Sequence, residues 1–220
     1  MNSENRKKGM SIFLQYMKLG GPVMWLILLC SMVAVFILVE RWLYYHRNHI
    51  SADELLVGLT NVLKRDGRML EATSLCENTP GPIAKILKIA ILDYDKDIED
   101  IRQAISEKAM IEIKKLEKRL NLLATIAYIS PLLGLLGTVL GMIAVFGVIE
   151  ARGAYVNVIE LSQGIRQALI TTASGLSIGI PCYVIYNYFV SRVELFTIEM
   201  SRAASEMLRF IKIQRTNKGE

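Results

Sequence analysis

Hydroxyl side chains stand inside two long apolar stretches of this sequence, where few residue types could do chemistry. Thr138 lies in the first stretch, and Thr171, Thr172 and Ser174 lie in the second. A hydroxyl tolerates apolar surroundings and can still bind water or a cation. Facing Thr138 and Thr172 side chains could therefore line a hydrated path or surround a titratable residue of a partner. Gln167 adds an amide, which forms hydrogen bonds but does not titrate.

The alternative role of these hydroxyls is packing. Ser and Thr in membrane helices commonly bond back to a carbonyl three or four residues earlier. Two matched stripes favour a further role, because Thr138 shares a helical face with Gly134, and Thr172 shares one with Ala168 and Gly175. Neither stretch contains Asp, Glu, Lys or Arg, so this chain by itself offers no evident proton carrier.

Glycines recur at helical intervals in both stretches. They are Gly134, Gly137 and Gly141 in the first, and Gly175 and Gly179 in the second. Glycine weakens a helix, and the usual return inside a membrane is close approach of another backbone. The glycines therefore predict helix packing, while the hydroxyls beside them are the candidate pore-lining groups.

Three apolar segments must position these residues. They are residues 22–45, 122–149 and 167–191, and the second has 28 residues without a charge. At about 1.5 Å per residue, such a helix exceeds a hydrocarbon layer of roughly 30 Å. The pattern predicts an all-α polytopic membrane protein with three transmembrane helices, two of them extended into a cytoplasmic helical domain.

Lys and Arg predict the orientation. Of the 26, 20 lie between residues 41 and 119 or after residue 191. Positive charge stays cytoplasmic, so residues 46–121 and the helix and tail at 192–220 should be inside, with the N-terminus and a short loop at 150–166 outside. The basic cluster at residues 6–8 opposes this orientation. The net charge of +5 reflects topology better than nucleic-acid binding, because no basic stripe interleaves with aromatic residues.

The segments outside the membrane are predicted to be helical. Ile12, Phe13, Tyr16 and Met17 have helical spacing, which suggests an interfacial helix within residues 1–21; a frayed leader is the alternative. Ser51 begins a capping box, and apolar residues spaced by three and four run from residue 98 into the second span. We expect one helix of about 50 residues there. Its alternating Glu and Lys residues suggest a solvated face or a subunit contact.

No catalytic or metal-ligating constellation is visible in the sequence. The motifs CxxC, HExxH and GxxxxGK[ST] are absent, and the three cysteines are dispersed. We therefore expect no enzyme activity, no metal and no cofactor. A membrane-embedded enzyme or solute carrier would need buried charges or inverted repeats, and neither is present.

Two stretches resemble the MotA/TolQ/ExbB proton-channel family. The run from Ser130 to Ile143 (SPLLGLLGTVLGMI) is similar to the family signature, and the run from Gln167 to Leu176 (QALITTASGL) is similar to its third helix. The start of the first span at Gly21 to Trp25, and Glu40-Arg41 at its end, are similar to ExbB-like members. The resemblance extends from about Gly20 to Arg192.

The resemblance implies a function and a set of partners. ExbB-like proteins form homopentamers in the inner membrane of Gram-negative bacteria, with the second and third helices around a pore. An ExbD- or TolR-like protein places a membrane Asp in the pore, and the proton motive force drives a TonB- or TolA-like protein that spans the periplasm. On that pattern Thr138 and Thr172 match the pore threonines. The resemblance implies energised transport across the outer membrane, with membrane lipids as surroundings.

Three alternatives stay open. The chain could serve TolQ-type envelope maintenance. It could also be a passive scaffold, in which the glycine stripes join copies and no ion moves. A flagellar stator subunit fits least, because the cytoplasmic insert is short. One departure matters, since many relatives have Glu where this chain has Gln167. A second acidic relay in this subunit is therefore in doubt, and we expect the partner's Asp to suffice.

Overall fold

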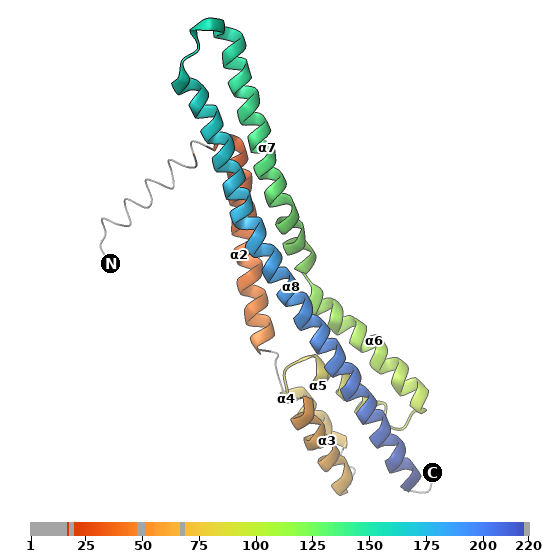
Figure 1. Cartoon of the computed structure of the whole chain (residues 1–220). Coiled ribbons are helices and arrows are strands. Elements are labelled where there is room, and N and C mark those ends of the chain that lie inside the picture. Colours follow the sequence, from red (N-terminus) through yellow and green to blue (C-terminus); the bar gives the residue numbers. More distant parts are fainter. Residues whose placement is uncertain (1–16, 18–19, 48–51, 67–68, 218–220) are drawn as a thin grey trace, which may run out of the picture. The chain divides into compact units, whose positions relative to one another are not determined.

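The computed structural model describes the chain except for residues 1–16, 18–19, 48–51, 67–68 and 218–220. Within the described residues every regular element is a helix, which confirms the predicted all-α fold. The order (Figure 1) is α2 (Gly21–Arg47), α3 (Ala52–Asp66), α4 (Met69–Asn78), α5 (Pro82–Leu92), α6 (Ile98–Glu117), α7 (Leu120–Arg152), the 3₁₀ turn η1 (Gly153–Tyr155) and α8 (Val158–Asn217). The predicted interfacial helix, apart from Met17, and the predicted cap at Ser51 lie outside the described residues.

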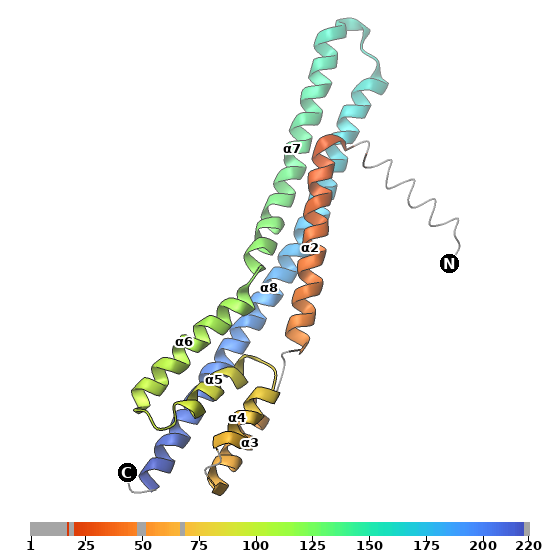
Figure 2. The same ribbon diagram turned by 180° about the vertical axis from the view of Figure 1, so that it is seen from behind.

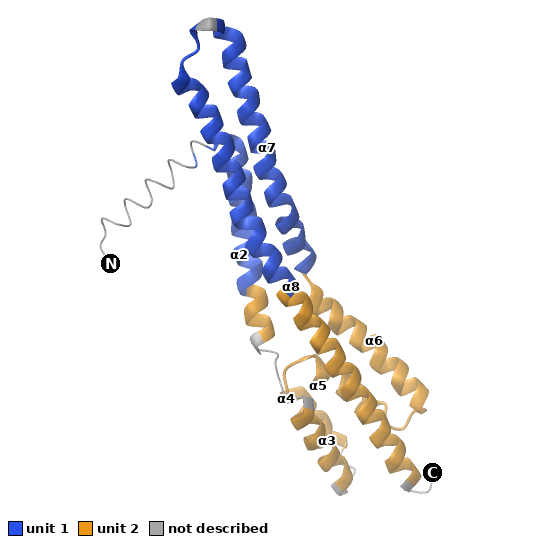
Figure 3. Ribbon diagram, viewed as in Figure 1, with its two compact units in different colours: residues 1–39, 119–187 blue, residues 40–118, 188–220 orange. Residues whose placement is uncertain are grey.

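The described chain divides into two compact units (Figure 3). Unit 1 is residues 1–39 and 119–187, and unit 2 is residues 40–118 and 188–220. Two helices, α2 and α8, therefore contribute one part to each unit.

Unit 1 contains the apolar parts of three helices. The stretches Gly21–Tyr45, Ile98–Arg152 and Val158–Thr216 are each long and apolar enough to cross a membrane, and the uncharged part of the second is residues 122–149. Large apolar side chains on their surface are exposed, among them Trp25 (62%), Phe146 (62%) and Leu169 (64%). An exposed apolar surface of this extent suits lipid contact. Figure 2 shows α2 beside α8 in this unit.

Residues 150–166, predicted as a short loop between two spans, are mostly helical. Helix α7 continues to Arg152 and α8 begins at Val158, so only Val156 and Asn157 lie outside helical elements there. Asn157 explains the early start of α8, because its side-chain oxygen accepts a hydrogen bond from the amide of Ile159 at 3.0 Å. Arg152 and Glu160 also pair across the turn at 2.7 Å.

Unit 2 packs α3, α4, α5 and α6 consecutively, each on the next. Pro82 stands in the first turn of α5, where its missing N–H costs nothing. Asp97 begins α6 by accepting a hydrogen bond from the amide of Ile98 at 2.7 Å. Buried apolar side chains from α5, α6 and α8 form the core, including Leu87, Ile101 and Met207.

The predicted continuous helix from residue 98 into the second span is also wrong, because it is broken between α6 and α7. Lys118 is extended (φ −50°, ψ 131°) and Arg119 has a left-handed backbone (φ 67°, ψ −5°). No Gly or Pro marks this place in the sequence. The break is accompanied by side-chain donors from α2, because Arg41 and Tyr45 bond to the last carbonyls of α6.

The alternating Glu and Lys residues of α6 do not all face solvent. Glu112 is 1% exposed and lies 2.7 Å from Lys115 Nζ and 3.1 Å from Lys85 Nζ. The interpretation of the charged residues as a solvated face is therefore wrong for Glu112. Because α6 is a charged helix, a carboxylate at Glu112 finds cationic partners there that an apolar span could not supply.

Candidate functional site

The glycines of α7 let the backbone of α8 approach closely. A Cβ added to Gly134 would lie 3.0 Å from Thr172 Cα, and one added to Gly141 would lie 2.9 Å from the carbonyl oxygen of Gly164. A Cβ on Gly137 would collide with the side chain of Thr171. Any side chain at these three positions would have to push the helices apart.

The glycines of α8 likewise let the backbone of α7 approach closely. A Cβ on Gly175 would collide with the carbonyl oxygen of Ser130, and one on Gly179 would lie 2.6 Å from Pro131 Cγ. Pro131 stands inside α7 and cannot donate a helical hydrogen bond, so the carbonyl of Ala127 loses its backbone partner. The two helices are therefore in backbone contact on both sides of Pro131.

The two threonines chosen from the sequence meet in this interface. Thr172 donates its hydroxyl to the carbonyl oxygen of Gly134 at 3.0 Å, and the Thr138 hydroxyl lies 3.2 Å from the same oxygen. The two hydroxyls also contact each other. Both side chains are half-buried. Two alcohols and one carbonyl thus form a compact polar cluster between two segments without Asp, Glu, Lys or Arg.

Thr171 and Ser174 are not part of this cluster. Thr171 is fully buried against Gly137 and donates its hydroxyl back to the carbonyl oxygen of Ala168 at 2.9 Å. Ser174 instead lines a cavity of about 420 Å³ between α2 and α8, together with Ser31. Their placement separates them from the Thr138 and Thr172 hydroxyls.

Gln167 lies against the start of α2. Its amide nitrogen faces Gly21, and a Cβ at Gly21 would lie 2.6 Å from it. Gly21 has a positive φ of 65°, which suits glycine. The amide of Gln167 is thus beside the first residue of α2, a position where helical N–H groups lack backbone partners.

Ser130 is a polar residue of this interface that the sequence analysis did not single out. It is fully buried, and its hydroxyl has no hydrogen-bond partner among the described residues. Its position four residues before Gly134 places it on the small-residue face, so the same spacing argument could have found it.

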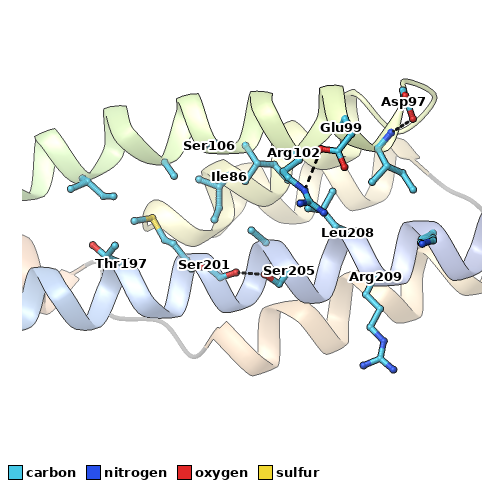
Figure 4. Close-up of a pocket in the computed structure, with 17 residues that line it drawn as sticks. Ile86, Asp97, Glu99, Arg102, Ser106, Thr197, Ser201, Ser205, Leu208 and Arg209 are labelled. Atoms are coloured by element: carbon cyan, nitrogen blue, oxygen red, sulfur yellow. Dashed lines mark hydrogen bonds and ion pairs between the residues drawn. The ribbon is translucent and has the colours of Figure 1, made fainter.

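A second hollow lies within unit 2, where α5, α6 and α8 line a cavity of about 710 Å³ (Figure 4). Polar groups in its lining bond to one another: the Ser205 hydroxyl donates to the Ser201 carbonyl oxygen at 2.9 Å, and Arg102 lies 3.8 Å from Glu99. We place the candidate site in unit 1, because the hydroxyl cluster is there.

Comparison with known proteins agrees with this geometry. The model of the MotA/TolQ/ExbB proton channel family matches residues 78–202, which is more than half of the chain and includes both threonines. The chain belongs to this family. As a family member with three membrane-length apolar helices, it is a multi-pass membrane protein.

Three relatives illustrate the similarity. A protein named as an ExbB homolog in Methanothermobacter thermautotrophicus is 26% identical over 82% of this chain and 64% of its own length. Biopolymer transport protein ExbB of Aquifex aeolicus is 45% identical over 39% of this chain and 57% of its own length. Tol-Pal system protein TolQ of Pseudomonas aeruginosa is 37% identical over 47% of this chain and 45% of its own length. The chain thus spans less than two thirds of these three relatives.

Proposed function

We propose that this chain is the ExbB-like subunit of an ion-driven motor in the bacterial inner membrane. Copies of it, five by family resemblance, surround the single membrane helices of an ExbD- or TolR-like protein that supplies a membrane Asp. The proton motive force then moves this assembly, and a TonB-like protein carries the movement to transporters of the outer membrane. The N-terminus is periplasmic and the C-terminus is cytoplasmic.

The observation that carries the proposal is the shared bonding of Thr138 and Thr172 to Gly134 in an uncharged segment. An aliphatic alcohol does not titrate at physiological pH, so these groups can solvate an ion or an acid but cannot replace one. A carboxyl group from a partner helix completes the chemistry. One proton crossing 100 mV releases about 2.3 kcal/mol, which is several times thermal energy and suffices to drive a conformational step.

The test replaces both threonines with valine, which has nearly the same shape and no hydroxyl. We expect Thr138→Val with Thr172→Val to abolish siderophore uptake energised by the proton motive force, while the complex still assembles and purifies intact. The matched control is Thr125→Val in the same helix, whose hydroxyl bonds back to the carbonyl of Asn121 at 2.8 Å outside the cluster. Unchanged uptake in the double variant would reject the pore role and favour the passive scaffold.

A TolQ-like role in envelope maintenance is the second candidate, because TolQ proteins are among the relatives. The two roles differ in the phenotype that the chain restores. Expression in a strain lacking its own ExbB and TolQ should restore growth on siderophore-bound iron if the ExbB-like role is correct. Restored resistance to detergent, without restored uptake, would favour the TolQ-like role.

A further inference from the structure

Two tyrosine rings meet on the surface of the paired helices α7 and α8. Tyr128 of α7 and Tyr183 of α8 have ring centres 5.9 Å apart, with the ring planes at 65°. Both residues stand inside uncharged segments, residues 122–149 and 167–191. Both side chains are exposed, Tyr128 by 60% and Tyr183 by 45%. A hydroxyl that faces hydrocarbon loses the hydrogen bonds that it makes in water, so this pair needs a polar neighbour.

The tyrosines lie on the same side of the helix pair as the hydroxyl cluster of Thr138 and Thr172. Tyr183 follows Thr172 by eleven positions, which is close to three full turns of α8. The two side chains therefore leave that helix from nearly the same face, about 20° apart. Ser174, on the face that lines the cavity with α2, is about 200° from Thr172. The ring contact with Tyr183 places the Tyr128 ring on this side too.

The tyrosine pair stands between the hydroxyl cluster and the end of the apolar segment that begins at Leu122. Along α7, Tyr128 is six positions from Leu122 and Thr138 is sixteen positions from it. At 1.5 Å per residue these separations are about 9 Å and about 24 Å. A proton at the hydroxyl cluster is therefore more than half a hydrocarbon layer from this end of the segment. In the proposed orientation this end is the cytoplasmic one.

The direction of the two side chains suits a path between these points. Long side chains of an α-helix lean toward its N-terminus. For Tyr183 this direction leads toward Thr172 and away from the end of the apolar segment at Ser191. For Tyr128 it leads toward Leu122. Tyrosine near the headgroups is otherwise typical of lipid contact, but a Tyr183 that leans toward the middle of the membrane does not fit that role.

Phenol hydroxyls can pass a proton through water, because each oxygen both donates and accepts hydrogen bonds. In each transfer an oxygen accepts one proton and releases another, so neither a tyrosine nor the water keeps a net charge. We propose that Tyr128 and Tyr183 form a second polar station of the ion path, between the hydroxyl cluster and the cytoplasm. This inference rests on the proposed function, and the station binds the water through which the partner's acid releases its proton.

Replacing both tyrosines with phenylalanine removes the hydroxyls and keeps the rings. We expect Tyr128→Phe with Tyr183→Phe to lower energised siderophore uptake at least about fivefold, since losing one hydrogen bond weakens an interaction by about that factor. The matched control is Tyr155→Phe, because Tyr155 is 90% exposed in the turn between α7 and α8, outside both uncharged segments. The control should keep the uptake of the parent chain. Uptake equal to that of the parent in the double variant overturns the proposal.

Cysteine labelling measures the hydration of this side without relying on uptake. The full chain, with its three native cysteines changed to alanine, carries either Tyr183→Cys or Val184→Cys. These neighbours have nearly the same depth but differ by about 100° around α8, and Val184 is 61% exposed. In inner-membrane vesicles, a charged methanethiosulfonate should label Tyr183→Cys at least about tenfold faster, because the reacting thiolate forms where water reaches it. Equal labelling, or faster labelling of Val184→Cys, overturns the proposal.

The two measurements separate the tyrosine station from the motor function. If the parent chain restores no uptake, the ExbB-like role fails, and the labelling alone decides whether the tyrosine side is hydrated. If the parent and the phenylalanine variant restore uptake equally, the motor function stands and the station is rejected.

Discussion

The Thr138 and Thr172 hydroxyls, from two different helices, share one acceptor, the carbonyl oxygen of Gly134, at 3.2 and 3.0 Å. The hydroxyl protons are directed toward this oxygen or toward the other hydroxyl. Toward their surroundings the two threonines therefore present lone pairs, which accept hydrogen bonds. A group that donates a hydrogen bond, such as a protonated carboxyl, matches this arrangement better than a carboxylate does. The pair would then favour the neutral form of a partner's acid.

Serine at both positions should preserve activity, because the proposed role requires the hydroxyl and not the methyl group. We expect Thr138→Ser with Thr172→Ser to retain at least about half of the energised uptake, since the net worth of each hydrogen bond, about 1 kcal/mol, is conserved. Uptake assays in the strain used for the valine variants provide the measurement. Loss of uptake in the serine variant to the level of the valine variant would show that side-chain shape, not the hydroxyl, is required.

Gly137 and Gly147 lie on the same helix and should respond oppositely to alanine. A methyl group at Gly137 would collide with Thr171, whereas nothing lies within 4 Å of a Cβ at Gly147. Gly137→Ala should cost about 1–3 kcal/mol from overpacking. Gly147→Ala should stabilise α7 by up to about 1 kcal/mol through helix propensity. Equilibrium unfolding in detergent micelles measures both, and equal effects would contradict the close contact of α7 with α8.

Much of the fold was predictable because long apolar runs determine membrane helices almost regardless of neighbours. The meeting of Thr138 with Thr172 was also within reach, since small residues spaced by three and four define one face of each helix. The placement of Ser174 was not. Ser174 is two positions after Thr172, about 200° around the helix, and only the position of α2 determines what that other face contacts.

The break after α6 could not be predicted from local sequence. Helix propensity is continuous through Lys118 and Arg119, and the carbonyls involved are bonded by residues more than 70 positions away in the chain. Such contacts override propensity only when the chain is folded. The burial of Glu112 was missed for the same reason, because Lys85 approaches it from another helix.

Gln167 should tolerate glutamate and suffer from alanine. Its amide lies against Gly21 at the start of α2, where unpartnered N–H groups and the helix dipole favour negative charge, so a carboxylate would be stabilised there. Gln167→Ala should slow energised uptake roughly two- to tenfold through loss of this contact. Complementation of a deletion strain measures both variants. An inactive Gln167→Glu protein would count against a supporting role for this side chain.

Glu112 should make unit 2 sensitive to acid. Burial raises the pKa of Glu112, but the hydrogen bonds from Lys115 and Lys85 together lower it by more than burial raises it. The pKa of Glu112 therefore lies below the ordinary value of 4.5. Because the pKa is lowered in the folded chain, the carboxylate stabilises the fold at pH values above 4.5. This contribution is lost as the pH falls through the pKa of the folded state. The contribution should therefore be complete at neutral pH.

Glu112→Gln should therefore destabilise the full chain by about 1–3 kcal/mol at neutral pH, because it leaves the lysines without their buried partner. The difference from the parent chain should shrink as pH falls below 4.5, since the parent carboxylate is then protonated too. Thermal unfolding in nanodiscs from pH 7 down to about pH 3 measures this convergence. The control is Glu107→Gln on the exposed face of α6, whose carboxylate accepts only the Gln103 amide at 3.1 Å among the bonds described. Parallel pH profiles for the Glu112 variant and the parent would contradict the stabilising role of the carboxylate.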